Sequence, residues 1–478
     1  METDGMNRRD FLKGTAWMGA VAVAAGGCVG RACAPVPGTM LGYAAPPLKK
    51  VRVGVVGLGS RGLRAPNRLS LIPGVEVTAI CDLRPERVDM VKKWFAENKK
   101  PLPKAFTGDE ACWKRMCEWD GIDVVYNVLP WKLHACVGVY AMKQGKHAFI
   151  EVPSAMYLDE CWELVETSEA TRRHCMQLEN ACYGEIALLE QRLCRQGALG
   201  EIVHAEGSYL HDLRSYFFRE NQNYEYWRLA WNRDHKGDQY PTHGLGPMAK
   251  CLDINHGDAF ETLVALGSSQ FGVEEWAREN LPDANPLKRW KIAMGDMNVT
   301  VIRTARGRVI TEKHNVTNPR PKSETFFIQG TKGAVGSFPF RIFLESDSPK
   351  YSVKEWPDET YTEEQRQKWM HPLWKDASAI AKKVGGHGGI DFLMDLRWAY
   401  CLQNGLPLDM DVYDLAAWCS VCELSERSVR GGGMPQKVPD FTRGGWHTAK
   451  PPDIQTVDLG KLGLGMEGVK AGAGYNGV

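Results

Sequence analysis

A tyrosine and a histidine three residues apart belong to a dense polar motif in the middle of the chain, Tyr240-Pro-Thr-His243-Gly-Leu-Gly-Pro247. Its proline and glycines restrict the backbone, so a loop of this composition can direct a phenol and an imidazole into one cleft. Histidine titrates near neutral pH and commonly moves protons in catalysis. A rigid loop with a structural histidine explains the same residues equally well. The motif therefore predicts a candidate acid–base pair with that alternative left open.

A second motif has the spacing of a dinucleotide-binding turn. The β-branched run Val51–Val56 predicts a buried parallel strand, and Gly57, Gly59 and Gly62 follow it in the order G-x-G-x-x-G. The first glycine of such a motif allows a tight turn, the second lets the backbone approach a pyrophosphate, and the third lets a helix pack on the strand. The amides at the N-terminus of the helix then face the phosphates. The motif predicts nucleotide binding.

An aspartate stands where the ribose of such a nucleotide would lie. Asp82 ends the next predicted strand and follows Gly57 by 25 residues, close to the roughly 20 that are typical of the ribose-binding carboxylate. A carboxylate at this point favours NAD over NADP, and Arg84 nearby keeps NADP as an alternative. A glycine-rich turn beside a solvated aspartate is the competing explanation.

Strands and helices alternate in the first part of the chain. Strands are predicted over 77–82, 123–130, 147–153 and 175–180, and helices over 85–98, 135–145 and 158–170. Such alternation predicts an α/β fold with a doubly wound parallel sheet, whose ligands bind at the carboxyl ends of the strands. The residues expected at that edge are Gly57 to Gly62, Asp82, Pro130 to His134, Glu151 and Asn180.

The pattern changes near residue 200. Alternating runs at 202–209, 297–303, 309–312, 324–329 and 333–336 predict a second α/β domain with a large, mostly antiparallel open sheet, and amphipathic helices are expected over 390–402 and 412–429. We divide the chain into a signal and linker (1–48), a Rossmann domain (49–180), a substrate-binding domain (181–450) and a glycine-rich tail (451–478).

Composition excludes several classes of partner. The chain has 478 residues with 44% hydrophobic and 24% charged residues, which is ordinary for a globular protein. A formal net charge of +1 suggests neither a nucleic-acid nor a membrane-surface partner. The 14 cysteines lack paired metal-ligand spacing, so no metal site is predicted. A homo-oligomer is compatible with the sequence.

The N-terminus has the pattern of a targeting segment. Arg8 and Arg9 precede an apolar stretch at 15–25, which predicts twin-arginine export to the periplasm. That stretch is shorter than the roughly 20 residues of a membrane span. Cys28 is a candidate lipid-attachment site, and cleavage near Ala34 or Ala45 is at least as compatible with the sequence.

The order of these motifs resembles that of the Gfo/Idh/MocA family of NAD(P)-binding proteins. That family commonly has Glu-Lys-Pro where this chain has Glu151-Val152-Pro153, and the absent lysine weighs against an ordinary sugar dehydrogenase. Residues 51–445 resemble more closely glycoside hydrolase family 109, the NAD-dependent α-N-acetylgalactosaminidases. The strings that carry this resemblance are LENACY at 178–183, GSYLHDLR at 207–214, YPTHGLGP at 240–247, LDIN at 252–255, HPLW at 371–374 and GHGGID at 386–391.

The resemblance implies roles for particular residues. It implies NAD contacts at Ser60, Arg61, Asp82, Trp131, His134, Glu151, Val152 and Asn180. It implies substrate contacts at Tyr209, Arg228, Tyr240, Pro241, Thr242 and His243. The positions usually considered catalytic match Glu151, Tyr183, Tyr240 and His243. One departure is Lys322, which stands where the family has a substrate-contacting tyrosine.

The implied reaction cleaves an α-glycoside of a small molecule or glycan by oxidation and elimination. NAD takes a hydride from C3 of the sugar, a base removes the C2 proton, the C1–O bond breaks, water adds, and the hydride returns. This differs from the usual pair of carboxylates. Two alternatives are an NAD(P)-dependent sugar oxidoreductase with net turnover of the cofactor and a non-catalytic sugar or nucleotide sensor.

Overall fold

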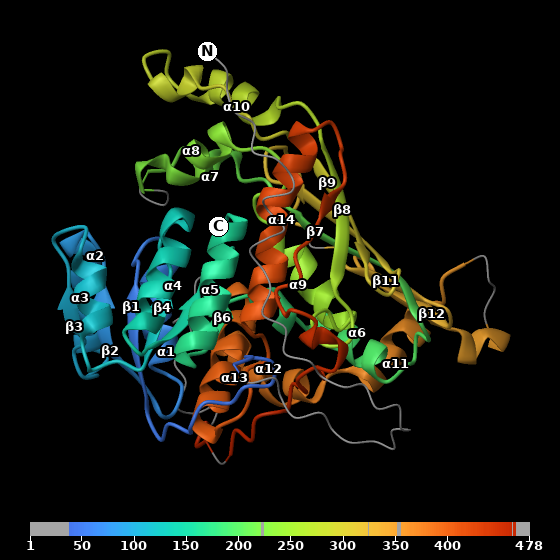
Figure 1. Ribbon diagram of the computed structural model, residues 1–478, viewed down its shortest axis with the longest axis horizontal. Helices are drawn as coiled ribbons and strands as arrows, with labels where there is room; N and C mark the ends of the chain where they lie inside the picture. The colour runs from blue at the N-terminus through green and yellow to red at the C-terminus, as the bar shows by residue number, and fades with distance from the viewer. Residues whose placement is uncertain (1–37, 221–223, 324, 351–354, 461, 465–478) are drawn as a thin grey trace, which may run out of the picture. The chain divides into compact units, whose positions relative to one another are not determined.

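A computed structural model describes residues 38–220, 224–323, 325–350, 355–460 and 462–464, so the predicted targeting segment lies outside the described residues. The first domain contains a six-stranded sheet in the order β3-β2-β1-β4-β5-β6 (Figure 1). Every neighbouring pair in it is parallel, which confirms the doubly wound sheet. Its strands are β1 Val51–Val56, β2 Val75–Cys81, β3 Lys104–Phe106, β4 Val124–Asn127, β5 His147–Ile150 and β6 Cys175–Gln177.

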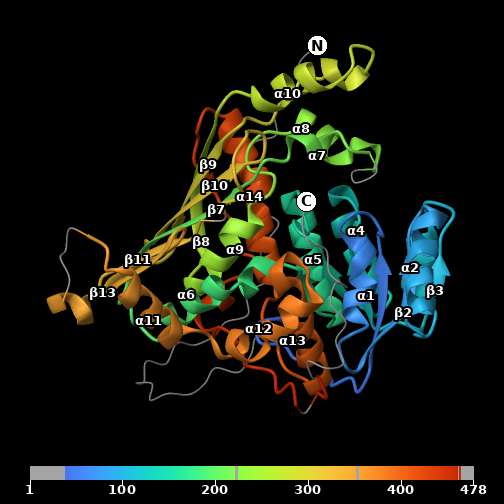
Figure 2. The ribbon, with the colours of Figure 1, turned by 180° about the vertical axis from the view of Figure 1, so that it is seen from behind.

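Helices cover both faces of this sheet, as a parallel sheet requires. They are α1 Ala65–Leu69, α2 Pro85–Glu97, α3 Cys112–Glu118, α4 His134–Lys143 and α5 Leu158–Thr171. The three helices expected from the sequence are α2, α4 and α5. Helix α13 (Ile390–Asn404), from the other end of the chain, packs beside α1 and β1, as the view from behind shows (Figure 2).

The second domain is built on an eight-stranded sheet in the order β13-β12-β11-β7-β10-β9-β8-β14. Its strands are β7 Ile202–Leu210, β8 Phe260–Gly267, β9 Asn298–Thr304, β10 Val309–Asn315, β11 Phe327–Gly330, β12 Gly333–Ser337, β13 Phe340–Leu344 and β14 Gln436–Lys437. The sheet is mostly antiparallel, as predicted. Among the described strands β7 and β10 form the exception, since they run parallel. The sequence patterns missed three strands of this sheet, β8, β13 and β14.

Two long helices link the domains. Helix α14 (Val412–Arg430) contacts α5 of the first domain and β8 of the second (Figure 1). Helix α13 was expected to be amphipathic, but it is buried on nearly all sides, because its charged residues are paired inside the protein. Asp395 accepts a hydrogen bond from Arg68 at 2.6 Å, and Arg397 donates to Asp409 at 2.7 Å.

The remaining helices belong to the second domain. They are α6 Glu185–Arg195, α7 Arg214–Phe217, α8 Trp227–Asp234, α9 Thr242–Cys251, α10 Gly272–Asn280, α11 Glu359–Trp369 and α12 Pro372–Val384. No helix in the described part of the chain is both long and apolar enough to span a membrane.

The expectation of a loop at residues 240–247 is wrong, because α9 begins at Thr242 and packs on β7. The glycines serve this packing. A Cβ atom on Gly244 would lie 2.5 Å from the amide nitrogen of Ser208, and one on Gly246 would lie 3.0 Å from Cγ of Glu179. Small residues therefore let a helix approach the sheet closely here, rather than turn the chain.

Candidate active site

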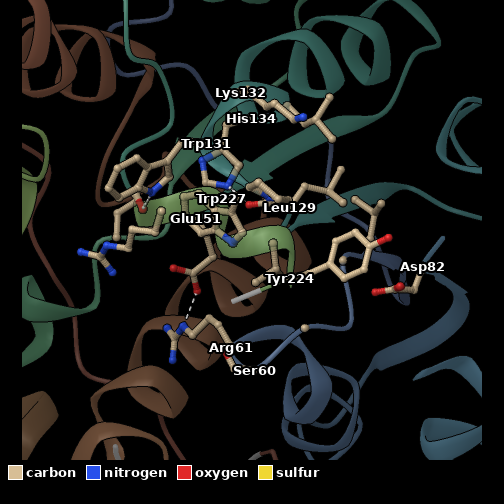
Figure 3. Close-up of a pocket in the computed structure, with 18 of the residues that line it drawn as sticks. Ser60, Arg61, Asp82, Leu129, Trp131, Lys132, His134, Glu151, Tyr224 and Trp227 are labelled. Atoms are coloured by element: carbon tan, nitrogen blue, oxygen red, sulfur yellow. Dashed lines mark hydrogen bonds and ion pairs between the residues drawn. The ribbon is translucent and has the colours of Figure 1, made fainter. Parts of the chain in front are cut away.

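A cavity of about 990 Å³ opens at the carboxyl edge of the first sheet. The second domain supplies its other wall, including residues of β7, α8 and α9. Trp227 of α8 is labelled in Figure 3. Most residues singled out from the sequence line it: Gly57, Gly59, Ser60, Arg61, Asp82, Trp131, His134, Glu151, Val152, Asn180, Tyr209, Arg228, Tyr240 and His243. The topology thus brings together side chains that are far apart in the sequence.

The glycine turn has the geometry that a dinucleotide needs. Gly57 has φ +89°, and a Cβ atom there would lie 2.6 Å from the carbonyl oxygen of Val128. A Cβ atom on Gly62 would lie 1.8 Å from the carbonyl oxygen of Gly57. Gly59 lines the cavity, and a Cβ atom on it would meet no protein atom within 4 Å. The space beside Gly59 is therefore cavity, where a pyrophosphate can approach the backbone.

The segment after the turn is less regular than expected. Gly62–Arg64 is a 3₁₀ turn, and α1 that follows has only five residues. Pro66 stands in the first turn of α1, where a proline is tolerated because its missing amide would have no partner within the helix. A short 3₁₀ turn therefore stands where the sequence predicted the N-terminus of a longer helix that would face the phosphates.

Asp82 closes the nucleoside end of the cavity. Its carboxylate accepts hydrogen bonds from the backbone amides of Leu58 at 2.7 Å and Arg84 at 2.9 Å. The guanidinium of Arg84 lies 4.7 Å from the ring centre of Tyr224, and its Nε is 3.4 Å from Asp82. Asp82 and Tyr224 are neighbours in Figure 3. A fixed negative charge here suits ribose hydroxyls and opposes a 2′-phosphate.

Arg61 joins the two domains beneath the cavity. Its Nε donates to Glu151 at 2.7 Å (Figure 3), and its NH2 donates to Asp391 at 2.9 Å. Asn180 also donates to Asp391, at 2.5 Å. Burial raises the pKa of Asp391, but the charges of Arg61 and His387 outweigh it and hold that pKa well below its usual range. Arg61 is therefore anchored from both domains, and it orients the Glu151 carboxylate.

An aromatic wall faces the glycine turn. The ring centres of Trp131 and Tyr240 are 5.8 Å apart, and those of Tyr209 and Tyr240 are 4.9 Å apart. The guanidinium of Arg228 lies 4.8 Å from the Tyr240 ring and 5.0 Å from the Trp131 ring. Burial and the neighbouring Tyr209 raise the pKa of Tyr240 well above its usual value, against the charge of Arg228. The wall offers both apolar faces and a protonated hydroxyl to a sugar.

Tyr240, His243 and Glu179 form a chain of contacts. The Tyr240 hydroxyl is 3.3 Å from Nε2 of His243, and Nδ1 of His243 is 2.6 Å from Oε1 of Glu179. Sequence reasoning gave Glu179 no role. No spacing rule could link it to His243, because the two are 64 residues apart. Asp391 was missed in the same way, although both residues lie inside strings quoted for the family resemblance.

Four of the expected site residues do not line the cavity. Tyr183 is wholly buried in the core, and its hydroxyl donates to Asp409 at 3.0 Å. Burial and Asp409 raise the pKa of Tyr183 well above its usual value. Pro241 and Thr242 are buried at the start of α9, and Gly62 packs against the glycine turn.

His134 lines the cavity but also holds the backbone around it. Its Nδ1 is 2.6 Å from the carbonyl oxygen of Pro153, and its Nε2 is 2.6 Å from that of Leu129. Burial lowers the pKa of His134 to about 4. Lys322 also lines the cavity, together with His211, Trp227 and His387 and with two residues to which the sequence gave no role, Tyr216 and Tyr224.

The fold and this cavity define an NAD-binding Rossmann enzyme whose second domain lines the same cavity. Residues 51–178 match the family model described as "Oxidoreductase family, NAD-binding Rossmann fold", and residues 183–448 match "Glycosyl hydrolase 109, C-terminal domain". The chain belongs to glycosyl hydrolase family 109, the NAD-dependent glycoside hydrolases that the sequence motifs resemble.

Individual relatives agree with this assignment. The chain is 43% identical over 423 residues to an alpha-N-acetylgalactosaminidase of Bacteroides fragilis, which covers 87% of this chain and 98% of that protein. It is 42% identical over 415 residues to a glycosyl hydrolase family 109 protein of Porphyromonas gingivalis, covering 85% of this chain and 87% of that protein. A levoglucosan dehydrogenase solved with NADH and levoglucosan shares the fold, with a TM-score of 0.60 at 18% identity, covering 82% of this chain and all of that one.

Proposed function

We propose that this protein hydrolyses terminal α-N-acetylgalactosaminides, or a related α-glycoside, by oxidation, elimination, addition and reduction. The observation that carries the proposal is a single cavity whose lining includes the glycine turn, the Tyr240–His243 pair and Glu151. The activity named for the Bacteroides fragilis relative supports the choice of sugar.

The residues of the first domain fit a dinucleotide. Gly57 and Gly59 leave room for the pyrophosphate, and Asp82 faces the ribose position. Bound NAD supplies a reversible hydride acceptor at C3 of the sugar. The aromatic wall formed by Trp131 and Tyr240 then positions the sugar ring and excludes water from its face.

The chain's own residues carry the proton transfers. We assign the C3 hydroxyl proton to Tyr240, backed by His243, because the two are in contact and line the cavity. A ketone at C3 acidifies the C2 proton, and Glu151 is the carboxylate placed to remove and return it. The structure keeps Tyr183 outside the cavity, so the C2 role falls to Glu151.

A screen of aryl glycosides tests this function. Purified enzyme without added NAD should cleave an aryl α-N-acetylgalactosaminide, while the nicotinamide absorbance shows no steady accumulation of NADH. The screen includes α- and β-linked sugars, because Lys322 alters a substrate-contacting position. Steady accumulation of NADH with a free sugar, without glycoside cleavage, would contradict the proposal and indicate a sugar oxidoreductase. Binding of NAD and sugar without turnover would indicate a sensor.

The histidine gives a residue-level test of the same function. His243→Ala removes the base that backs Tyr240, so turnover should fall by about 10²-fold or more. The NAD content of the purified variant should be unchanged, because the glycine turn and Asp82 are intact. Full activity of the variant would refute the role of His243.

We also propose that the chain is exported by the twin-arginine route. The support is the pair Arg8 and Arg9 before the apolar stretch 15–25. Changing both arginines to lysine should retain the protein in the cytoplasm, as measured by cell fractionation. An unchanged distribution would argue against this route.

A further inference from the structure

Glu179 contacts His243 from outside the cavity. Glu179 is wholly buried and is not among the cavity-lining residues, whereas Tyr240 and His243 are. The carboxylate therefore cannot touch a sugar in this cavity. It can act on one only through His243, whose Nδ1 it meets at 2.6 Å.

Two elements fix the position of this carboxylate. Glu179 follows β6 and caps the 3₁₀ turn Asn180–Tyr183, where its Oε1 accepts a hydrogen bond from the amide of Ala181 at 3.1 Å. His243 stands in the first turn of α9, and Gly246 lets that helix approach Glu179, since a Cβ atom on Gly246 would lie 3.0 Å from Cγ of Glu179. The carboxylate of Glu179 therefore follows a strand of the Rossmann domain, and the imidazole of His243 belongs to a helix of the second domain.

Glu312 is buried close enough to Glu179 for the two carboxyl groups to interact, and Asp238 is a buried acid close to Glu312. Burial, with the nearby charge of Asp238, raises the pKa of Glu312 well above its usual value. Burial also raises the pKa of Asp238 to about 7. Both shifts favour the neutral acid forms of Glu312 and Asp238.

We propose that Glu179 is a positioning residue that holds His243 in the tautomer able to accept a proton from Tyr240. An ionised carboxylate only accepts hydrogen bonds, so the proton of the neutral imidazole lies on Nδ1. The lone pair of Nε2 then faces the Tyr240 hydroxyl, which donates to it. This inference rests on the proposed function for its catalytic part.

The proton transfers balance along the path from the C3 hydroxyl through Tyr240 to His243. As the C3–H bond breaks with loss of hydride, the O–H bond of the C3 hydroxyl also breaks and its proton passes to Tyr240. The phenol proton passes in turn to Nε2 of His243. The imidazolium that results is stabilised by the adjacent carboxylate, which does not itself change protonation. Each transfer reverses when the hydride returns.

The tautomer can be read in the full-length enzyme without any substrate. Nitrogen NMR of histidine-labelled protein should show His243 with a protonated Nδ1 and an unprotonated Nε2, with the resonances assigned by their loss in His243→Gln. The Nδ1 proton should resonate far downfield, because it makes a short hydrogen bond to a carboxylate. Protonation on Nε2 alone would overturn the proposal whether or not any variant folds.

Kinetics of Glu179→Gln test the catalytic part. With wild-type cleavage of the aryl glycoside as reference, kcat should fall by about 10²-fold or more, while KM and NAD content stay near the wild-type values. The Nδ1 proton should move upfield or disappear. Unchanged kcat in a folded variant would overturn the proposal. Absence of cleavage by the wild-type enzyme would instead refute the proposed function, and the NMR result would stand separately.

Glu190→Gln provides the matched control. Glu190 is also wholly buried, and burial raises its pKa well above the usual value. It lies on α6 and does not line the cavity. This variant should keep both the kcat and the His243 resonance of the wild-type enzyme. A comparable loss in both variants would mean that removing any buried acid disturbs the site.

Discussion

Asp391 is a buried carboxylate that lies against two arginines and a histidine. Arg61 and His387 contact it directly, and Arg68 lies 3.7 Å away. Breaking a buried ion pair by removing one partner is costly because the remaining charges are left uncompensated. Asp391→Asn should therefore lower the free energy of unfolding by about 3–5 kcal/mol, measured by denaturant titration at neutral pH.

The same carboxylate predicts a pH dependence of stability. Its folded pKa lies well below the value of about 3.9 expected for an unfolded aspartate. Its stabilising contribution is therefore complete above about pH 5 and is lost as the pH falls toward the folded pKa. The difference in the free energy of unfolding between wild type and Asp391→Asn should therefore become smaller as the pH falls below about 5. A difference in unfolding free energy that stays constant with pH would contradict this account.

Asp283→Asn is the control for this pH dependence. It breaks an exposed pair with Lys288, so it should change the free energy of unfolding little at any pH.

At the scale of elements, Gly59 and Gly244 can be compared directly, because an added Cβ atom would meet protein atoms at Gly244 and none within 4 Å at Gly59. A Cβ atom on Gly244 would lie 2.5 Å from the Ser208 amide nitrogen, within the contact of α9 with β7. Gly244→Ala should therefore destabilise the protein by about 1–3 kcal/mol through overpacking. Gly59→Ala meets no protein atom, so it should leave the stability of the NAD-free protein unchanged but lower the NAD content of the purified protein. Thermal unfolding and cofactor release measure the two effects, and equal destabilisation by both changes would contradict this division.

Elements with strong periodicity could be predicted from the sequence, and elements set by tertiary packing could not. The β-branched strand β1 and helices such as α5 carry clear local patterns. The stretch starting at Tyr240 reads as a loop because glycine and proline are poor helix formers. It forms α9 because close packing on β7 demands small residues there.

The site could be predicted in part for the same reason. Strand ends and the glycine motif placed Asp82, Glu151 and Asn180 at one edge of the sheet. Residues that contact the site from distant parts of the chain could not be predicted in this way, because no local sequence pattern marks them. Asp391 contacts Arg61, which is 330 residues away in the sequence. A match to a short family string does not show which residues are in contact in the fold.

At the scale of the whole molecule, the cavity couples the two domains. Its walls come from both domains, and Arg61 is held by Glu151 from one and Asp391 from the other. A ligand that binds only the folded state stabilises it by about 2.7 kcal/mol at a concentration 100 times its Kd. Removal of NAD should thus lower the Tm of the entire chain in one transition. Two separate transitions, with only the first domain shifted, would contradict this coupling.

Isotope exchange tests the central claim, that the enzyme cleaves glycosides by oxidising and restoring the sugar in one cavity. The purified enzyme is given an aryl α-N-acetylgalactosaminide in deuterium oxide without added NAD, and the released sugar is analysed by NMR. The account predicts deuterium at C2, hydrogen retained at C3, and no net NADH. Cleavage with hydrogen retained at C2 would show that no C2 proton is removed and would contradict the account.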